Sequence, residues 1–208
     1  MKKFLTRSTR PIEVWPDKKV SELTEEMLYT AFQGRKLAEA IEVWSKMLKS
    51  RYLVIWLGLA GAMVPAGMRR IFAYFIKRRM IDVLVTTGAN LYHDCCEALG
   101  VKHYLGSHFI DDVKLRKYKV DRIYDVFADE EKFYEVDRRI MNEFCLLLKD
   151  NHPYSSREVL YLLGKFLSNH AKERDSILIS AYKSNVPIFC PALCDSSLGF
   201  SIMFANRR

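Results

Sequence analysis

Three times along the chain, a short hydrophobic run leads into a glycine-containing turn and then into a segment with helical periodicity. The runs are Tyr52–Leu57, Asp82–Thr87 and Val186–Ala192. Hydrophobic strands that alternate with helices in this way are typical of a parallel sheet covered by helices on both faces. We therefore predict an α/β fold built on a doubly wound, mostly parallel sheet.

The residues before the first hydrophobic run have a different character. Residues 1–20, with Pro11 and Pro16, are predicted to form an extended arm. Helical periodicity begins at Val20 and returns strongly over residues 34–48, where hydrophobic residues recur at spacings of four and three. We predict two parts, an N-terminal arm with its first helix (1–33) and an α/β domain (34–208).

Beyond the second helix, the pattern predicts a short strand near Tyr104 and then a polar stretch, Asp111–Arg122. Helices are expected over residues 130–149, 155–171 and 175–184. Ser155 and Glu158 have the spacing of a capping box, which starts the second of these helices. The helix that starts near Phe200 is cut off by the chain end, so we expect one sheet edge and one face to lack a cover.

Composition excludes a membrane protein and gives no support for nucleic-acid binding. The 208 residues are 50% hydrophobic and 28% charged, as in soluble globular proteins. The net charge of +8 comes from scattered basic residues without the interleaved aromatic residues of a nucleic-acid-binding module. The uncharged stretch Tyr52–Met68 is at the short limit for a membrane-spanning helix, and glycines and Pro65 interrupt its second half. We expect neither a nucleic-acid partner nor a membrane partner.

The cysteines indicate a reducing compartment. There are five of them, an odd number that does not suit a disulfide framework. No histidine cluster joins them at the spacing of zinc ligands, so no metal site is expected. The N-terminus carries positive charge but no hydrophobic run behind it, unlike a signal peptide. A cytoplasmic location follows as the prediction.

Glycine-containing or polar turns follow each predicted parallel strand, at Gly58–Gly67, Thr86–Asn90 and Asp195–Gly199. Ligands of open parallel sheets bind outside the carboxyl ends of the strands. Glycine lets the backbone approach a ligand, and a helix N-terminus offers N–H groups to a pyrophosphate. The first turn lacks the GxGxxG order, and glycines that only pack a helix would explain it equally well. Three turns at one sheet edge predict a nucleotide-like site.

Individual polar residues at these turns have two interpretations. Asp195 is either a ligand contact or the N-cap of the following helix, and Asn90 is interpreted as an N-cap whose side chain also faces the site. His93 and Asp94 lie on the opening turn of the second helix. A histidine in that position is either a satisfied structural side chain or a functional one.

The longest motifs at these turns resemble deoxyhypusine synthase in its archaeal form. They are Gly58–Arg69, Val83–Asp94 and Pro187–Gly199, and Arg122–Phe127 and Gly34–Ala38 also match. The similarity runs through nearly the whole chain in the right order. It corresponds to the N-terminal two-thirds of the family.

The resemblance implies a Rossmann-like fold, a homotetramer and an NAD-dependent reaction. In that reaction the aminobutyl group of spermidine passes to an enzyme lysine and then to one lysine of the translation initiation factor 5A precursor. The implied polyamine-binding residues are His93 and Asp94. The implied NAD-binding residues lie in the three turns: Gly61, Ala62, Met63, Val64, Pro65, Thr87, Gly88, Ala89, Asp195 and Ser197.

The sequence departs from the family at its C-terminal end. The family's catalytic lysine lies in a Gly-Gly-Gly-x-x-Lys-His segment, and no such segment occurs in this chain. No catalytic residue is therefore assigned. The leading interpretation is a truncated or split deoxyhypusine synthase that needs a complementing subunit. A homospermidine synthase-like enzyme and a catalytically inactive regulatory paralogue are the alternatives.

Overall fold

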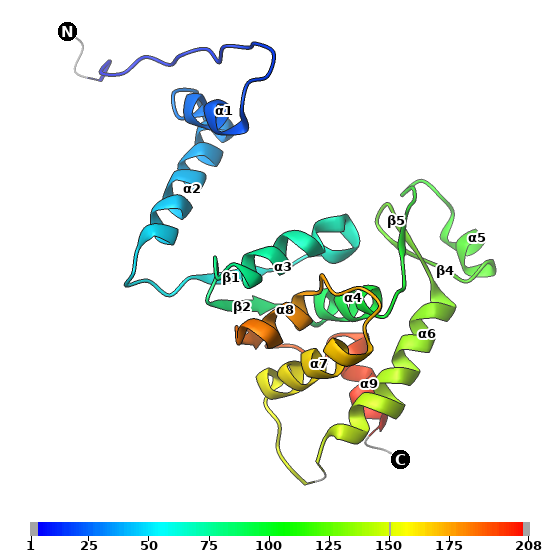
Figure 1. Cartoon of the computed structure of the whole chain (residues 1–208). Helices are drawn as coiled ribbons and strands as arrows, with labels where there is room; N and C mark the ends of the chain where they lie inside the picture. The colour runs from blue at the N-terminus through cyan, green and yellow to red at the C-terminus, as the bar shows by residue number, and fades with distance from the viewer. Residues whose placement is uncertain (1–3, 150, 206–208) are drawn as a thin grey trace. The chain divides into compact units, whose positions relative to one another are not determined.

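The structure, a computed structural model, describes residues 4–149 and 151–205, and the chain divides into two compact units, Met1–Leu53 and Val54–Arg208 (Figure 1). The predicted boundary after residue 33 falls just inside a helix, because α2 spans Phe32–Lys49. The first residues of the predicted arm and the terminal Arg207–Arg208 lie outside the described part.

The N-terminal unit contains an extended arm and two helices, as the sequence predicts. Helix α1 spans Val20–Met27, and the arm is tied to the end of that region by a hydrogen bond from the Arg10 N–H to the Tyr29 carbonyl (2.9 Å). The guanidinium of Arg10 also lies over the Tyr29 ring. The predicted hydrophobic stripe of α2 stays largely on the surface, with Leu37 54% exposed and Ile41 38% exposed.

A three-stranded parallel sheet forms the centre of the C-terminal unit. Its strands are β1 (Trp56–Leu59), β2 (Val83–Thr86) and β6 (Ile188–Phe189), in the order β1-β2-β6. All three predicted parallel strands are present, but they are shorter than predicted. The first begins at Trp56 rather than Tyr52, since the Ile55 N–H bonds to the Asp82 carboxylate before regular pairing starts.

Helices follow each of these strands. After β1 come a short turn, η1 (Val64–Met68), which is kinked at Gly67 with a φ of +84°, and then α3 (Arg69–Lys77). After β2 comes α4 (Gly88–Ala98), and after β6 comes α9 (Ser197–Ala205). Helices α7 (Ser156–His170) and α8 (Ile177–Ser184) pack closely where Gly164 of α7 meets the Leu178 carbonyl of α8. This order confirms the doubly wound α/β class.

Two long segments differ in detail from their predictions. The capping box at Ser155 and Glu158 is confirmed, because the Ser155 hydroxyl accepts the Glu158 N–H and the Glu158 carboxylate accepts the Ser155 N–H. The predicted helix over residues 130–149 is instead three pieces. They are α6 (Glu130–Arg139), the π-helical turn η2 (Ile140–Phe144) and the 3₁₀ turn η3 (Cys145–Leu147).

A second, antiparallel sheet was not predicted. It orders β3 (His103–Leu105), β5 (Val126–Asp129) and β4 (Val120–Ile123) side by side, and α5 (Asp112–Lys117) precedes β4. The strand near Tyr104 is confirmed as β3. The hairpin β4–β5 escaped detection because every residue of β4 is only half-buried, which weakens the hydrophobic pattern. Its turn also places Tyr124, rather than glycine, at a positive φ of 57°.

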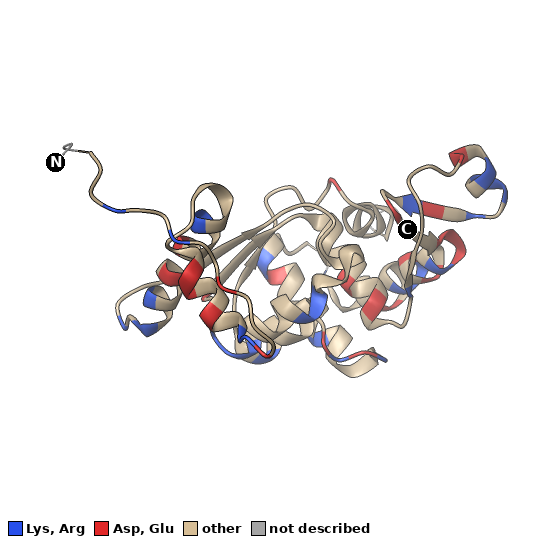
Figure 2. Cartoon of the chain, turned by 90° about the horizontal axis from the view of Figure 1, so that it is seen from above, with Lys and Arg blue, Asp and Glu red and all other residues tan. Residues whose placement is uncertain are grey.

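Basic and acidic residues are intermixed along the helices, as Figure 2 shows. Between residues 4 and 205, leaving out residue 150, the structure has no helix long and apolar enough to cross a membrane. The same residues contain no group of three or more potential metal ligands.

Candidate functional site

Asn90 joins the turns that follow the first two parallel strands. It is fully buried, and its Oδ1 accepts the backbone N–H groups of Met63 (3.2 Å) and Val64 (3.4 Å). Its Nδ2 donates to the hydroxyls of Thr86 (3.4 Å) and Thr87 (3.3 Å). One side chain therefore fixes the turn after β1 against the start of α4.

The turn after β6 lies against the same point. A Cβ added to Gly88 would lie 2.4 Å from the Ser196 hydroxyl oxygen, so only glycine leaves room for the third turn to approach α4. Ser196 donates to the Leu193 carbonyl (2.8 Å) and holds its own turn in place. The structure thus brings the three predicted turns together at the carboxyl ends of the strands.

The outer parts of these turns are open. Gly61 has a φ of +75°, and nothing lies within 4 Å of the position a Cβ would take. At the N-terminus of α4, no described group accepts the N–H groups of Gly88 and Ala89. Such amides suit a pyrophosphate. Five of the implied NAD-contacting residues are exposed besides Gly61: Ala62, Thr87, Ala89, Asp195 and Ser197.

The remaining implied residues form the base of the site. Val64, Pro65 and Gly88 are buried, and Met63 is half-buried. Because these residues have little exposed surface, a ligand would meet their turns mainly through the backbone. An open glycine turn together with helix-terminal amides that have no partner among the described residues offers donors to an anionic group.

Capping assignments from the sequence need correction. Thr87, not Asn90, is the N-cap of α4, and its hydroxyl accepts the Asn90 N–H (3.5 Å). Asn90 is instead the internal link between turns. Helix α9 begins after Ser196, whose hydroxyl accepts the Gly199 N–H (3.4 Å). Asp195 is thus not needed as a cap, and its exposed carboxylate has no partner among the described residues.

Asp94 has its carboxylate turned into the protein. It is fully buried, and it accepts the N–H groups of Ile177 (2.9 Å) and Leu178 (2.8 Å) and the Ser176 hydroxyl (2.8 Å). These donors form the N-terminus of α8, where a negative charge is stabilised. Burial nevertheless raises the pKa of Asp94 to about 6, because desolvation outweighs the hydrogen bonds. The carboxylate joins α4 to α8 and has no exposed surface for an amine.

His93 belongs to a chain of polar contacts that the sequence did not reveal. Its Nδ1 lies 3.1 Å from Nε2 of His103, whose Nδ1 lies 2.8 Å from the Glu97 carboxylate. Glu97 also pairs with the buried Arg69 at 2.6 Å. Burial and the neighbouring His103 lower the pKa of His93 to about 4, so His93 is neutral at pH 7.

This chain of contacts borders a cleft of about 730 Å³ beside the first turn. Gly67 and Arg69 line it from the turn and α3, Glu97 from α4, and His103 from β3. Residues of the antiparallel sheet, of two helices and of the turn after β1 thus meet there. Sequence spacing alone could not have found the cluster, because β3 reaches α4 only through the tertiary fold.

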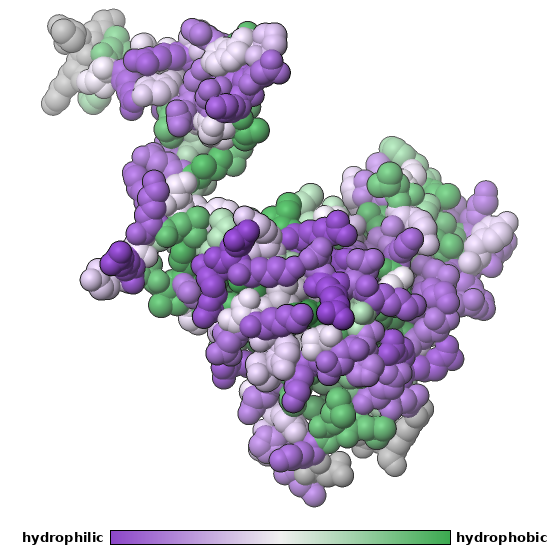
Figure 3. All heavy atoms as spheres, in the orientation of Figure 1, coloured by the Kyte–Doolittle hydropathy of each residue, from purple (hydrophilic) through white to green (hydrophobic). Residues whose placement is uncertain are grey.

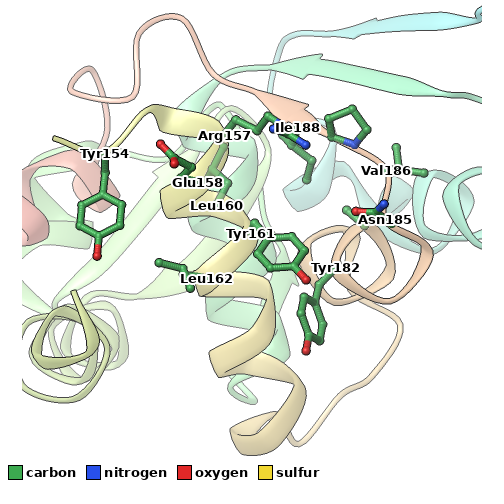
Figure 4. A pocket seen from close by; sticks show the side chains of 12 residues that line it. Tyr154, Arg157, Glu158, Leu160, Tyr161, Leu162, Tyr182, Asn185, Val186 and Ile188 are labelled. Carbon is green, nitrogen blue, oxygen red and sulfur yellow. The ribbon is translucent and has the colours of Figure 1, made fainter. Parts of the chain in front are cut away.

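Another cavity, of about 340 Å³, lies away from the turns. Figure 4 shows Tyr161 of α7 and Tyr182 of α8 lining it, with Val186 just before β6. The two tyrosine rings meet edge to face, with centroids 5.0 Å apart. Because the cavity lies at the amino end of β6, it is not part of the site at the carboxyl ends.

The fold and the gathered strand-end turns define a Rossmann-like α/β protein. The family model described as deoxyhypusine synthase matches residues 22–208, and the chain belongs to that family. A Methanosarcina acetivorans protein named "Probable deoxyhypusine synthase 2" is 54% identical over 205 residues, which are 99% of this chain and 59% of the relative. The corresponding Archaeoglobus fulgidus protein is 48% identical, over 88% of the chain and 59% of the relative. The chain therefore spans about three-fifths of the length of these relatives.

A solved structure shows the same fold. A candidate deoxyhypusine synthase from Entamoeba histolytica superposes with a TM-score of 0.66 at 22% identity, covering 92% of this chain and 64% of that one. The resemblance predicted from the sequence motifs is confirmed at the level of family and fold.

Proposed function

We propose that this chain forms the NAD-binding part of a deoxyhypusine synthase. The reaction is NAD-dependent transfer of the aminobutyl group of spermidine to a lysine of the translation initiation factor 5A precursor. The observation that carries the proposal is the meeting of three turns at the strand carboxyl ends. Among the described residues, the amides of Gly88 and Ala89 and the carboxylate of Asp195 have no partner. Family membership supports the proposed reaction, its spermidine substrate and its protein acceptor.

In this proposal NAD, when bound, would supply the acceptor for the hydride that spermidine loses on oxidation. The backbone of Gly61–Pro65 and Thr87–Ala89 would hold the cofactor's phosphates, because open glycine turns and helix-terminal amides suit anions. Asp195 accepts hydrogen bonds from hydroxyl groups, since a carboxylate would repel phosphate. Ser197 lies in the same turn and adds a hydroxyl.

The polyamine roles implied for His93 and Asp94 stay predictions. The observed contacts support a positioning role. The Asp94 carboxylate accepts hydrogen bonds from the N-terminus of α8, and His93 is half-buried against His103. A neutral His93 does not repel a cationic amine, which is compatible with a polyamine nearby.

No lysine of these 208 residues is proposed as the catalytic one, and we expect that lysine in a complementing segment that corresponds to the unmatched part of the relatives. An imine-forming lysine needs a pKa lowered by burial, and no lysine of the chain follows the family's glycine-rich motif. The test is incorporation of labelled spermidine into the factor 5A precursor. We expect no labelling by the purified chain, and labelling once the complementing segment is added. Strong labelling by the chain alone would contradict the proposal; labelling of a free diamine instead would indicate homospermidine synthase-like chemistry.

A catalytically inactive regulatory paralogue is the second candidate. In Methanosarcina mazei two relatives coexist, numbered 1 and 2, and the chain is 42% and 55% identical to them. Two family members in one organism can have different roles, one catalytic and one regulatory. If the chain changes the activity of a full-length enzyme but never gains transfer from an added lysine segment, this second function is correct.

We also propose a cytoplasmic oligomer, a homotetramer in the family pattern or a complex with the complementing subunit. The exposed hydrophobic residues of α2, among them Leu37 and Ile41, support it, because surfaces of this kind commonly mark interfaces. Light scattering should show a mass well above 24.3 kDa at micromolar concentration. A monodisperse monomer would contradict this expectation.

A further inference from the structure

Three of the five cysteines lie at one cleft of about 920 Å³. Cys145 belongs to η3, Cys190 directly follows β6, and Cys194 lies in the turn between β6 and α9. All five cysteines are free thiols. The other two, Cys95 and Cys96, are fully buried in α4. The cleft therefore gathers all the thiols outside α4.

This cleft is open to solvent. Hydrophobic surface borders it at η3, where Leu146 is 79% exposed. In Figure 3 hydrophobic atoms gather at the lower end of the C-terminal unit, where Figure 1 shows the chain leaving α6. The exposed residues Lys149 and His152 continue its wall with polar groups. A small molecule in solution can thus reach the thiols that line the cleft.

Two of these thiols belong to a single turn. Cys190 and Cys194 are four residues apart, and the Asp195 N–H closes the turn on the Ala192 carbonyl (3.1 Å). The Ala192 N–H donates to the Cys190 sulfur, so that thiol points into the turn. Burial raises the pKa of the Cys190 thiol, and the neighbouring Cys194 raises it further. Cys194 itself is exposed. An accessible thiol therefore lies beside a sheltered one, as in redox-sensing pairs where the second thiol resolves the oxidised first.

The same turn packs tightly against two helices. A Cβ added to Gly199 of α9 would lie 2.6 Å from the Cα of Cys194 and 2.4 Å from the Leu193 carbonyl oxygen. That oxygen also lies 3.2 Å from the position of a Cβ on Gly88 of α4. A disulfide brings two sulfur atoms closer together than two free thiols can lie. Closing it within the turn must therefore move Cys194 and loosen these contacts.

We propose that Cys190 and Cys194 form a reversible disulfide in response to peroxide, and that the bond shifts the turn between β6 and α9. The Cys194 thiolate attacks one oxygen of hydrogen peroxide; the O–O bond breaks, one water leaves and a sulfenic acid forms. The Cys190 thiolate then attacks the Cys194 sulfur; the S–S bond forms, the S–O bond breaks and a second water leaves. The two thiols lose two electrons and two protons, and the peroxide is reduced to two waters.

Reduction by a dithiol reverses the bond through thiol–disulfide exchange. A disulfide of this kind suits a reducing compartment, where such bonds are transient and sense oxidants. The inference rests on the thiols and on the packing of their turn, and it holds whether or not the strand-end turns bind NAD.

The test is oxidation of the purified full chain with hydrogen peroxide. We expect a chain lighter by two hydrogen atoms, a peptide map that joins Cys190 to Cys194, and reversal by dithiothreitol. The Gly199 and Phe200 N–H groups, which Ser196 accepts, should exchange about tenfold faster in the oxidised chain. A bond from Cys194 to Cys145 would overturn the pairing, and unchanged exchange would overturn the shift of the turn.

Matched variants separate the pair from the third thiol of the cleft. Cys194→Ser, at an exposed position, should fold like wild type by circular dichroism and form no disulfide. Cys190→Ala should leave the Cys194 sulfenic acid unresolved, so that its mass rises by added oxygen atoms. Cys145→Ser is the control and should form the bond as wild type does, because burial raises the pKa of Cys145 to about 11 and keeps that thiol protonated. Loss of the disulfide in Cys145→Ser, or its persistence in Cys194→Ser, would contradict the proposal.

Discussion

The first and second turns of α4 differ in where their polar groups point. At the first turn, Thr87 and Ala89 are exposed, and the N–H groups of Gly88 and Ala89 have no partner in the described part of the chain. One turn later, Asp94 is fully buried with three donors on it. Both turns belong to one motif of the family resemblance. Unpaired groups at a surface are available to a ligand, whereas hydrogen-bonded groups in the interior join one helix to another.

Loss of the Asp94 carboxylate should have the largest effect on stability. Asp94→Ala leaves two buried N–H groups and the Ser176 hydroxyl without their acceptor, which should lower the free energy of unfolding by about 3 kcal/mol. Asp94→Asn keeps one acceptor oxygen and should cost less. Urea unfolding followed by circular dichroism measures both. A loss below about 1 kcal/mol for Asp94→Ala would mean that the second turn of α4 is not a structural joint.

The link between turns at Asn90 should have the next largest effect. Asn90→Ala removes the acceptor for the Met63 and Val64 N–H groups, and the expected destabilisation is about 2 kcal/mol. Asn90→Asp restores that acceptor but not the donor to Thr86, so its stability should lie between wild type and Asn90→Ala. Proteolysis within residues 61–67 should become faster in the same order. Equal stability of all three proteins would show that the turns hold together without Asn90.

The pH dependence of stability tests the neutral state of His93. Its folded pKa, about 4, lies below the unfolded value of about 6.5, so its contribution is present above pH 6.5 and is lost as pH falls through 4. The neighbouring Asp94 acts in the opposite direction, because its pKa is raised to about 6. His93→Gln should therefore remove about 1–2 kcal/mol of the stability loss between pH 6.5 and 4. An unchanged pH profile would place His93 in a hydrated environment.

The sequence predicted the parallel strands and their helices well because their signals are local. Hydrophobic runs and glycine turns, such as Asp82–Gly88, need no distant partner to be recognised. The predicted start of β1 was less accurate. There the Asp82 carboxylate accepts the Ile55 N–H, and regular strand pairing begins only at the next residue. The β4–β5 hairpin has neither buried alternation nor a glycine turn, so its pattern was too weak to detect.

Within the site, the sequence located the turns but not the contacts that join them. Asn90 was expected to cap a helix, yet its amide reaches the N–H groups of the previous turn 26 and 27 residues away. The contacts from His93 through His103 and Glu97 to Arg69 link α4 with β3 and α3. Contacts of this kind depend on how elements pack, which periodicity and capping rules do not specify.

NAD titration of the complex between this chain and its complementing segment tests the central claim most directly. Asp195→Ala should weaken NAD binding by about 1–3 kcal/mol and leave the free energy of unfolding unchanged, because the Asp195 carboxylate has no protein partner in the described part of the chain. Asp112→Ala, at an exposed residue paired with Arg122 and outside the turns, is the control and should bind NAD as wild type does. Calorimetry that finds equal NAD affinity for Asp195→Ala and wild type would contradict the assignment of the strand-end turns as the cofactor site.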